Sequence, residues 1–327
     1  MNAKRIVAII IALLVLFASW MFSVSRIAKE TSLLKDIATG SAQPSTQEEI
    51  LEYGNQNQKI AVVDIIDVIE QGHDFDNIIS SLETIRSDDK VKGVLLYIDS
   101  PGGGVYEAAQ ISDKIKQIKE ETGIPFYASM GSLCASGGYY IAANCDRIFA
   151  AKETMTGSIG VINSGLNFSG LFQKYGISED VIKSGKYKDI GSSSREMTDD
   201  ERKIMQELID SSYDEFLNVV ANGRKLDKEY VRSLADGRIY DGRQALKNKL
   251  IDEIGYYEDT LDALKSELNI KNPTVVDYQY NDRFYGLQRF FGSTMENIGK
   301  SSLQKEIDAV RSVINTPSRP MYMYGGK

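Results

Sequence analysis

The feature that most restricts the fold of this chain is a regular alternation of strand-like and helical segments between residues 59 and 161. Apolar runs rich in Val and Ile, such as residues 59–69 and 91–100, alternate with segments whose apolar residues recur at helical spacing, such as residues 105–121. Parallel strands need a long crossover, usually a helix, between one strand and the next. The alternation therefore predicts an α/β fold with a largely parallel sheet and flanking helices.

A second helical region follows, and capping residues mark its start. Thr198 and Glu201 have the T-x-x-E spacing of a capping box, which satisfies two backbone N–H groups at a helix N-terminus. The amphipathic pattern continues to Gly223, a residue type common at helix ends. We therefore expect a long helix that Gly223 ends, and mainly helical structure from there to about Leu268.

Residues 6–25 form an apolar run without a charged side chain. A helix of this length spans roughly 30 Å, the thickness of the hydrocarbon core of a bilayer. Lys4 and Arg5 precede the run, and no small-residue cleavage site of a signal peptide follows it. The positive flank favours a cytoplasmic N-terminus. We therefore expect a single-pass membrane protein whose folded domain lies outside the cytoplasm.

These patterns divide the chain into five parts. A polar stretch without sustained periodicity precedes the first strand-like segment, and two prolines precede the last Met and Tyr residues. The expected parts are a cytoplasmic N-terminus (1–5), a transmembrane anchor (6–25), a linker or arm (26–57), a folded domain (58–268) and a C-terminal extension with an exposed tail (269–327).

Composition excludes several classes of function. The net charge is −8 and no basic stripe with interleaved aromatic residues occurs, so we expect no nucleic-acid partner. With two cysteines and one histidine, His73, the chain lacks the residues of thiolate-rich zinc sites and His-based metal clusters, and we expect no metal and no cofactor. Cys134 and Cys145 would be separated by one helix, too far apart for a disulfide, so both are expected to be free and buried.

A glycine-rich sequence, DSPGGG at residues 99–104, lies between a strand-like segment and the helix expected from Val105. Glycines permit positive φ angles and close approach of a substrate, so such a turn can direct backbone N–H groups toward an anion or a developing oxyanion. The alternative is a tight turn that binds nothing, which is the more common role of such glycines.

Ser136 is the strongest candidate nucleophile in the sequence. It lies in A-S-G-G after a strand-like run and at the start of an apolar helix, where the following N–H of Gly137 can stabilise a tetrahedral oxyanion. The alternative is a serine that only caps the helix. Ser129, Ser132 and Cys134 are competing nucleophiles, but no histidine or basic pair lies near Cys134 in the sequence to stabilise its thiolate.

A serine nucleophile needs a base, and His73 occurs in a polar turn typical of solvated histidines. Lysine can serve instead when desolvation or nearby positive charge favours its neutral form. Lys183, Lys186 and Lys188 lie between an apolar, strand-like segment and the helix at Thr198. Alternation would place Lys186 and Lys188 on one face of a strand, and it does not choose between them.

Four motifs together resemble the signal peptide peptidases of the S49 family, in their short bacterial form. They are, in chain order, D-S-P-G-G at 99–103, A-S-G-G-Y-Y at 135–140, T-G-S-I-G-V at 156–161 and S-G-x-x-K-D-I at 184–190. The resemblance covers about residues 58–265 and implies a ClpP/crotonase-like fold for an S49-like peptidase domain. It also implies hydrolysis of peptide bonds by a Ser/Lys dyad through an acyl-enzyme.

The resemblance assigns roles to individual residues. Ser136 matches the nucleophile, Lys188 the general base, and Ser158 a serine that orients the lysine. The amides of Gly103 and Gly137 match the oxyanion hole, and Gly102 stays open as an alternative to Gly103.

The implied function is that of a serine endopeptidase, anchored in the bacterial cell membrane, that degrades remnant signal peptides. The expected partners are peptide substrates, the lipid bilayer through residues 6–25, and further copies of the chain in a homo-oligomeric ring, in which adjacent protomers could supply Ser136 and Lys188. Two alternatives stay open, a related Ser/Lys peptidase acting on integral membrane proteins and a catalytically silent peptide-binding scaffold. Intact Ser136, Ser158 and Lys188 favour an enzyme over the scaffold.

The C-terminal sequence itself contains a candidate ligand. Met321, Tyr322, Met323 and Tyr324 follow Pro320, which disfavours helix. A groove that binds substrate as an added strand could accept this segment, with Met321 and Met323 on one face. The alternative is a disordered terminus. As a hypothesis, the tail occupies or is trimmed by the catalytic groove and competes with substrate.

Overall fold

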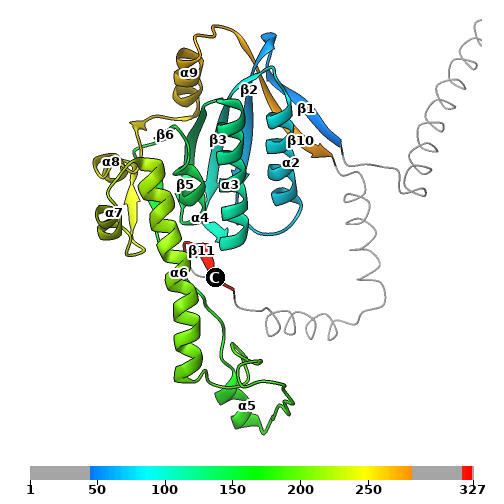
Figure 1. Cartoon of the computed structure of the whole chain (residues 1–327), viewed down its shortest axis with the longest axis vertical. Coiled ribbons are helices and arrows are strands. Elements are labelled where there is room, and N and C mark those ends of the chain that lie inside the picture. The colour runs from blue at the N-terminus through cyan, green and yellow to red at the C-terminus, as the bar shows by residue number, and fades with distance from the viewer. Residues whose placement is uncertain (1–44, 282–318, 326–327) are drawn as a thin grey trace, which may run out of the picture. The chain divides into compact units, whose positions relative to one another are not determined.

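A largely parallel β-sheet is the central feature of the described residues, which in this computed structural model are 45–281 and 319–325 (Figure 1). Within these ranges the sheet has nine strands, most of them in the order β1-β10-β2-β3-β5-β6-β9, while β7 pairs with β5 and β8 with β7. The strands are β1 (Ser45–Glu52), β2 (Asn55–Ile66), β3 (Val91–Ser100), β5 (Phe126–Ala135), β6 (Arg147–Ala150), β7 (Met155–Gly157), β8 (Ile239–Asp241), β9 (Glu253–Ile254) and β10 (Pro273–Asn281).

The central strands pair in parallel, as the alternation of strands and helices predicted. β2 pairs with β3, and β3 with β5, so that Val62, Leu95 and Tyr127 stand in one row across the sheet. β5 also pairs in parallel with β6 and β7, whereas β7 and β8 are antiparallel. The predicted α/β fold with a largely parallel sheet and flanking helices is therefore confirmed.

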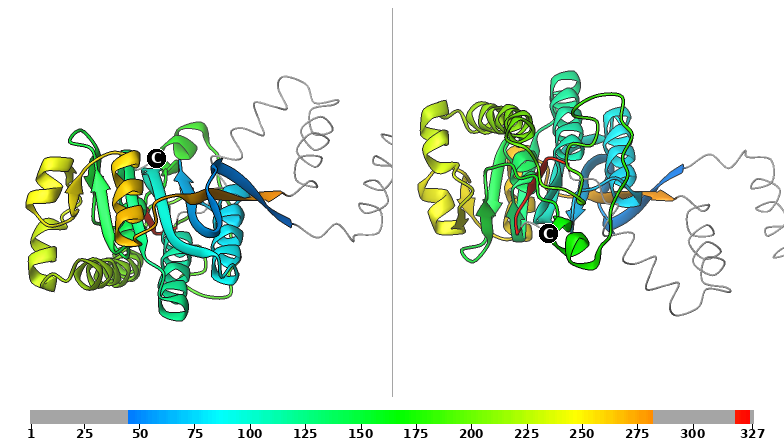
Figure 2. Two further views of the ribbon diagram at one scale, coloured as in Figure 1. Left: turned by 90° about the horizontal axis from the view of Figure 1, so that it is seen from above. Right: turned by 90° about the horizontal axis from the view of Figure 1, so that it is seen from below.

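Helices cover both faces of the sheet (Figures 1 and 2). α2 (His73–Ser87) and α3 (Val105–Thr122) belong to the larger hydrophobic core, and α9 (Tyr257–Glu267) packs in a smaller core. Because alternate β2 residues enter the two cores, both faces of this strand are buried, as is typical of parallel sheets. The remaining helices are α4 (Gly137–Ala142), α5 (Ser169–Tyr175), α6 (Asp199–Arg224), α7 (Lys228–Leu234) and α8 (Gly242–Lys247).

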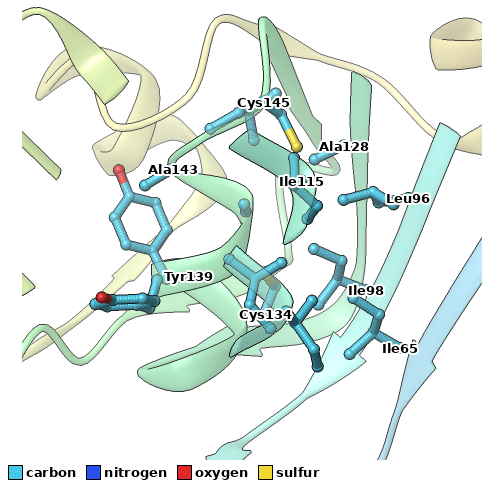
Figure 3. Close-up of a cluster of buried hydrophobic side chains, with 14 of the residues drawn as sticks. Ile65, Leu96, Ile98, Ile115, Ala128, Cys134, Tyr139, Ala143 and Cys145 are labelled. Atoms are coloured by element: carbon cyan, nitrogen blue, oxygen red, sulfur yellow. The ribbon is translucent and has the colours of Figure 1, made fainter. Parts of the chain in front are cut away.

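The larger core contains both cysteines. Cys134 and Cys145 are buried and free, as expected, and Ile115 lies between them in the view of Figure 3. Burial raises the pKa of the Cys134 thiol well above its usual range and that of Cys145 to about 12. Neither thiol is therefore ionised at neutral pH, and both act as small apolar core residues.

Two neighbouring strands at one side of the sheet lie outside the boundaries that the sequence predicted for the folded domain. β1 lies in the stretch expected to be a linker, and β10 lies beyond the expected end at Leu268 and pairs in parallel with β2. The sequence of β1, STQEEILE, is mostly polar and gives no alternating pattern. Its position at the edge of the sheet explains this composition, because charged edge strands resist pairing with other chains.

α6 begins as predicted and ends slightly later. The Thr198 hydroxyl accepts a hydrogen bond from the Glu201 backbone N–H, and the Glu201 carboxylate accepts one from the Thr198 N–H, which confirms the capping box. The helix continues through Gly223 to Arg224, so Gly223 does not end it. A Cβ on Gly223 would lie 1.9 Å from the Ala143 carbonyl oxygen, so this glycine permits the close approach of α6 to the end of α4.

Residues 176–198 contain no helix or strand, although the sequence predicted an apolar strand before Lys183. The apolar side chains of that segment are exposed, and Ile182 is 98% exposed. A strand needs a neighbour to satisfy its backbone groups, and no described strand lies beside this segment. The alternation around Lys186 and Lys188 therefore does not correspond to a strand.

The predicted membrane anchor, residues 6–25, lies outside the described residues. So do the predicted cytoplasmic N-terminus (1–5), most of the linker and much of the C-terminal extension. Among the residues that are described, no helix is long and apolar enough to cross a bilayer.

Candidate active site

Ser136 lies where β5 ends and α4 begins, in a strained backbone conformation. Its φ of 52° and ψ of −114° are unusual for a residue with a side chain, and such strain costs about 1–3 kcal/mol. The residue is only 1% exposed, and its hydroxyl neither caps α4 nor finds another hydrogen-bond partner among the described residues. Helix capping, the alternative explanation for this serine, is therefore not its role here.

Ser158 lies directly beside Ser136. β7 pairs with β5 so that Gly157 stands opposite Ala135, and the Ser136 N–H donates to the Gly157 carbonyl at 2.8 Å. Ser158 follows with a φ of 48° and is buried, while its N–H donates to the Arg238 carbonyl. Two serines from separate motifs, both with positive φ, are thus brought together.

The glycine-rich turn lies against the backbone of Gly137, the residue after Ser136. Gly102–Gly104 is the short strand β4, which holds Ile69 by two backbone hydrogen bonds of 2.8 and 2.9 Å. A Cβ placed on Gly137 would lie 3.1 Å from the Gly103 nitrogen, so the backbones of the two proposed oxyanion glycines are in contact. Gly102 is part of the same contact, because a Cβ there would lie 2.6 Å from the Gly137 nitrogen.

The C-terminal segment pairs with this glycine strand. β11 (Met321–Met323) is antiparallel to β4 with Tyr322 opposite Gly103, and it lies close to α4 in Figure 1. On its other side, Met321 and Ile162 exchange two backbone hydrogen bonds of 2.9 and 3.0 Å. A Cβ on Gly102 would lie 2.0 Å from the Tyr322 carbonyl oxygen. The extended tail therefore directs this carbonyl toward the glycine amides beside Ser136.

The side chain of Tyr322 fills an aromatic pocket. Its ring stacks on Tyr140 at 4.9 Å and contacts Phe216 at 4.7 Å, and its hydroxyl donates to the Ser212 carbonyl at 2.9 Å. Tyr322 is 1% exposed, so the predicted exposed tail is wrong at this residue. Met321 and Met323 do share one face, as expected, but the pocket receives the residue between them.

The three candidate lysines differ in their partners. Lys183 pairs with Asp189 at 2.6 Å and Lys186 with Asp200 at 2.7 Å. The hydrogen bond that Lys186 donates to Asp200 raises the pKa of Lys186, which disfavours its neutral form. Lys188 is exposed, and no ion pair joins its ammonium group to another described residue. The structure thus distinguishes lysines that the sequence pattern could not.

Lys188 forms no hydrogen bond with the Ser136 hydroxyl within the described chain. The segment that carries Lys188 lies at the N-terminal end of α6, away from the sheet (Figure 1). Phe216, in the second half of α6, contacts Tyr140 of α4, and roughly 25 Å of helix separates it from the helix start. One chain therefore brings Ser136 and Ser158 together but leaves Lys188 apart.

An ionic network that was not predicted from the sequence holds the segment of residues 183–190, which contains the three candidate lysines and is called the lysine segment below. Arg195 donates to both carboxylate oxygens of Glu201, at 2.6 and 2.8 Å, and to the Asp189 carboxylate at 3.0 Å. These contacts lower the pKa of Glu201 to about 2 and hold that of Asp189 well below its usual range. Arg195 lies three residues before the capping box, and its position beside that motif is the only sequence signal for it.

The other candidate base, His73, and the other candidate serine nucleophiles do not share the environment of Ser136. His73 begins α2 and lines a cavity of about 250 Å³ with Asp64 and Asp277, and the Ser136 hydroxyl is not bonded to it. Ser132 donates to Asp99 at 3.0 Å. Ser129 is buried within β5 with no hydrogen-bond partner for its hydroxyl among the described residues, as for Ser136.

Within residues 45–281 and 319–325, no group of three His, Cys, Asp or Glu side chains is arranged to hold a metal ion. The candidate site is therefore built from serine hydroxyls, glycine amides and the aromatic pocket for the bound strand.

Comparison with known proteins agrees with this arrangement. The family model of peptidase family S49 matches residues 118–271, and that of Clp protease matches residues 47–152. A protein of Enterococcus faecium, provisionally named signal peptide peptidase SppA, is 42% identical over 85% of each chain. A protein of Synechocystis sp., provisionally named a protease, is 38% identical over 82% of this chain and 96% of its own length. Protease 4 of Haemophilus influenzae is 32% identical over 69% of this chain and 37% of its own. The chain therefore belongs to peptidase family S49 and is a serine endopeptidase.

Proposed function

We propose that this peptidase cleaves extended apolar peptides, remnant signal peptides among them, by a Ser136/Lys188 dyad at the outer surface of a bacterial cell membrane. The observation that carries the proposal is the position of the Tyr322 carbonyl, which faces the glycine amides beside Ser136. A strand bound between β4 and Ile162 is in the extended conformation that a peptide substrate needs. Tyr322 thus occupies the position of the residue before the cleaved bond.

The proposed reaction uses residues of this site in sequence. The Ser136 Oγ attacks the carbonyl carbon while the neutral Lys188 Nζ accepts its proton. The N–H groups of Gly137 and Gly103 stabilise the oxyanion, and Lys188 returns the proton to the leaving amine as the peptide bond breaks. Water, deprotonated by the same lysine, then attacks the ester carbonyl, and the lysine returns that proton to the Ser136 Oγ as the ester bond breaks and the acid is released. Ser158, beside Ser136, orients the lysine.

A neighbouring copy of the chain is the proposed source of Lys188. The lysine is exposed and lies apart from Ser136 in its own chain. It belongs to the segment before α6, residues 162–198, which we call the arm and which has an unusual number of exposed apolar side chains. Such a surface is typical of a protein interface. Those side chains are Leu166, Leu171, Tyr175, Ile177, Val181 and Ile182. A head-to-tail arrangement in which each arm reaches the next copy closes into a ring.

The proposed membrane anchor is residues 6–25, whose apolar length matches a bilayer. It would hold the groove beside peptides left in the membrane. The relative in Enterococcus faecium has the name of a signal peptide peptidase, which supports this class of substrate. The aromatic pocket supports it as well, because Tyr140 and Phe216 offer apolar surface to one substrate side chain.

The first experiment is covalent labelling of the full chain with a peptidyl phosphonate that has Tyr next to phosphorus. We expect one modification at Ser136, mapped by mass spectrometry, and none in Ser136→Ala. Ser129→Ala is the matched control, since it removes another buried serine of the same region, and it should retain the label. Modification at Ser129 or Cys134 would contradict the assignment.

The same inactive variant separates the two substrate classes. Ser136→Ala chains, isolated from membranes, should retain cleaved signal peptides when these are the substrate. Retention of integral membrane proteins in their place would support the alternative peptidase.

A further inference from the structure

Glu107, in the first turn of α3, is a buried carboxylate beside the strand-binding groove. The residue is 1% exposed, and its Oε1 accepts a hydrogen bond of 2.8 Å from the Arg319 Nη1. Its Oε2 has no hydrogen-bond partner among the described residues. Burial of a carboxylate is unfavourable unless charged or polar groups compensate, so the partner of Glu107 matters energetically.

The carboxylate lies directly against the strand that binds the tail. A Cβ on Gly104 would lie 1.9 Å from the Glu107 Oε2 and 3.4 Å from the Arg319 guanidinium carbon. Gly104 in turn pairs with Met321 in the β4–β11 ladder. Glu107 is therefore part of the groove, and Arg319 reaches it from the C-terminal tail of the same chain, which is bound there.

A purely structural role in stabilising α3 does not account for the contacts of the Glu107 carboxylate. An acidic residue in the first turn of a helix stabilises the helix dipole, and Glu107 occupies such a position. However, its side chain does not cap α3, whose N-cap residue is Gly104. The carboxylate is also buried against β4, and its one ionic partner in the described chain is Arg319, not a group of the helix itself.

We propose that Glu107 determines specificity by recognising a basic side chain at the fourth residue before the cleaved bond. The inference rests on the proposed function, in which Tyr322 is the first residue before that bond and Arg319 is therefore the fourth. The substrate class is a peptide with an arginine or lysine, two intervening residues, and then a large aromatic or apolar residue. Arginine is preferred, because its planar guanidinium can also reach the Oε2 that lacks a partner.

The first test measures binding of the tail in the full chain without catalysis. In a Ser136→Ala background, hydrogen exchange of the Met321–Met323 amides reports how tightly the tail is bound. Glu107→Gln and Arg319→Gln should each accelerate this exchange about tenfold, since a charged hydrogen bond is lost in either case. The double variant should exchange no faster than either single variant. Glu120→Gln, on the exposed end of the same helix, is the matched control and should change nothing.

The second test measures cleavage of peptides that have the sequence of residues 317–326 with Arg, Gln or Glu at the position of Arg319. The unmodified enzyme should have a kcat/KM about 10- to 100-fold higher for the Arg peptide than for the Gln peptide, and lower still for the Glu peptide. Glu107→Gln should reduce the Arg-to-Gln ratio to about twofold or less, and Glu120→Gln should leave it unchanged.

Two results would overturn the role of Glu107. One is tail exchange that is the same in all variants, and the other is a Glu107→Gln enzyme that is equally slow on every peptide, as a structural residue would be. If exchange changes as expected but no peptide is cleaved, recognition of the basic residue stands and the proposed peptidase function is what fails.

Discussion

At the scale of the residue, backbone geometry distinguishes the candidate nucleophile from its competitors. Ser136 and Ser129 both have buried hydroxyls without a partner in the described chain, but only Ser136 has a positive φ and lies beside the glycine amides. The Ser136 hydroxyl makes no capping hydrogen bond to the helix it precedes, which keeps it available for a substrate. Chemistry at this site therefore depends on glycines that leave room for a carbonyl group.

Gly102→Ala tests this dependence. The new Cβ would lie 2.0 Å from the position of the Tyr322 carbonyl oxygen, so we expect kcat/KM for peptides to fall at least about 100-fold. Gly123→Ala is the control, because Gly123 also has a positive φ, of 70°, but no atom lies within 4 Å of its Cβ position. It should lose stability and keep activity. Equal activity of the two variants would show that Gly102 does not face the substrate.

The choice among the lysines is a second test at this scale. Lys188→Ala should lower kcat at least about 100-fold, the usual contribution of a general base, while KM changes little. Lys186→Ala should matter far less, because Lys186 is paired with Asp200, which raises its pKa and keeps it charged. Equal losses in the two variants, measured by steady-state kinetics, would be inconsistent with Lys188 as the base.

At the scale of the element, local signals could be read from the sequence and non-local ones could not. The central strands and α3 follow from apolar periodicity, and the start of α6 follows from its capping box. β1 has no such pattern, because its place depends on pairing with β10 from the far end of the chain. The strand predicted before Lys183 is absent for the opposite reason. Its apolar pattern is present in the sequence, but the segment has no neighbour among the described strands with which to pair.

The candidate site also combines residues that local sequence signals identify with residues that only the folded structure brings together. Ser136, Ser158 and the glycines stand together because each follows a strand of the same sheet. Ser136 and the glycine-rich turn could be proposed from their places between a strand and a helix, whereas Ser158 could be proposed only from the resemblance to the S49 family. The aromatic pocket could not be proposed, since it combines Tyr140, Phe216 and Tyr322 from three distant elements. Arg195 was missed because its role arises only when α6 and the lysine segment meet.

Arg195→Met tests how far this network positions the lysine segment. Glu201 and Asp189 have lowered pKa values in the folded chain, so their pairing with Arg195 stabilises the fold above their ordinary pKa values of 4.5 and 3.8. That stabilisation is lost as the pH falls through the folded pKa, which for Glu201 is about 2. We therefore expect urea unfolding at pH 7 to show a less stable variant, and the difference to shrink from about pH 4.5 downward.

Kinetics distinguish positioning from stability alone. If the network positions Lys188, Arg195→Met should lower kcat more than it changes KM at temperatures where both proteins are folded. Arg195→Lys should restore only part of the rate, because lysine cannot reproduce the paired contacts to Glu201. A variant with normal kcat would mean that the network stabilises the arm without positioning the base.

At the scale of the whole molecule, the described chain holds all the proposed residues of the substrate groove except Lys188, which lies in an arm that does not line the groove. Ser136, the glycine amides and the aromatic pocket lie together at the sheet. The segment between α5 and α6, which contains Lys188, lies at the N-terminal end of α6, away from the sheet (Figure 1). The first half of α6 is mostly exposed, while its second half packs into the core through Phe216, Leu217 and Val220. A projecting helix with exposed apolar side chains at its tip is expected to contact another protein.

Mixed oligomers test whether the second protein is another copy of this chain. Ser136→Ala and Lys188→Ala chains should each be inactive as pure assemblies. Because a site shared between copies takes Ser136 from one and Lys188 from the next, some interfaces of a mixed assembly combine two intact residues. We therefore expect co-expressed variants with different affinity tags, purified through both tags, to recover part of the activity, about a quarter per site if the chains mix at random and pair head to tail. A mixture of Ser136→Ala with Ser136→Ala,Lys188→Ala has no intact nucleophile and should stay inactive. Doubly purified assemblies without activity would show that both residues must come from one chain, which would require the arm to fold back toward its own sheet.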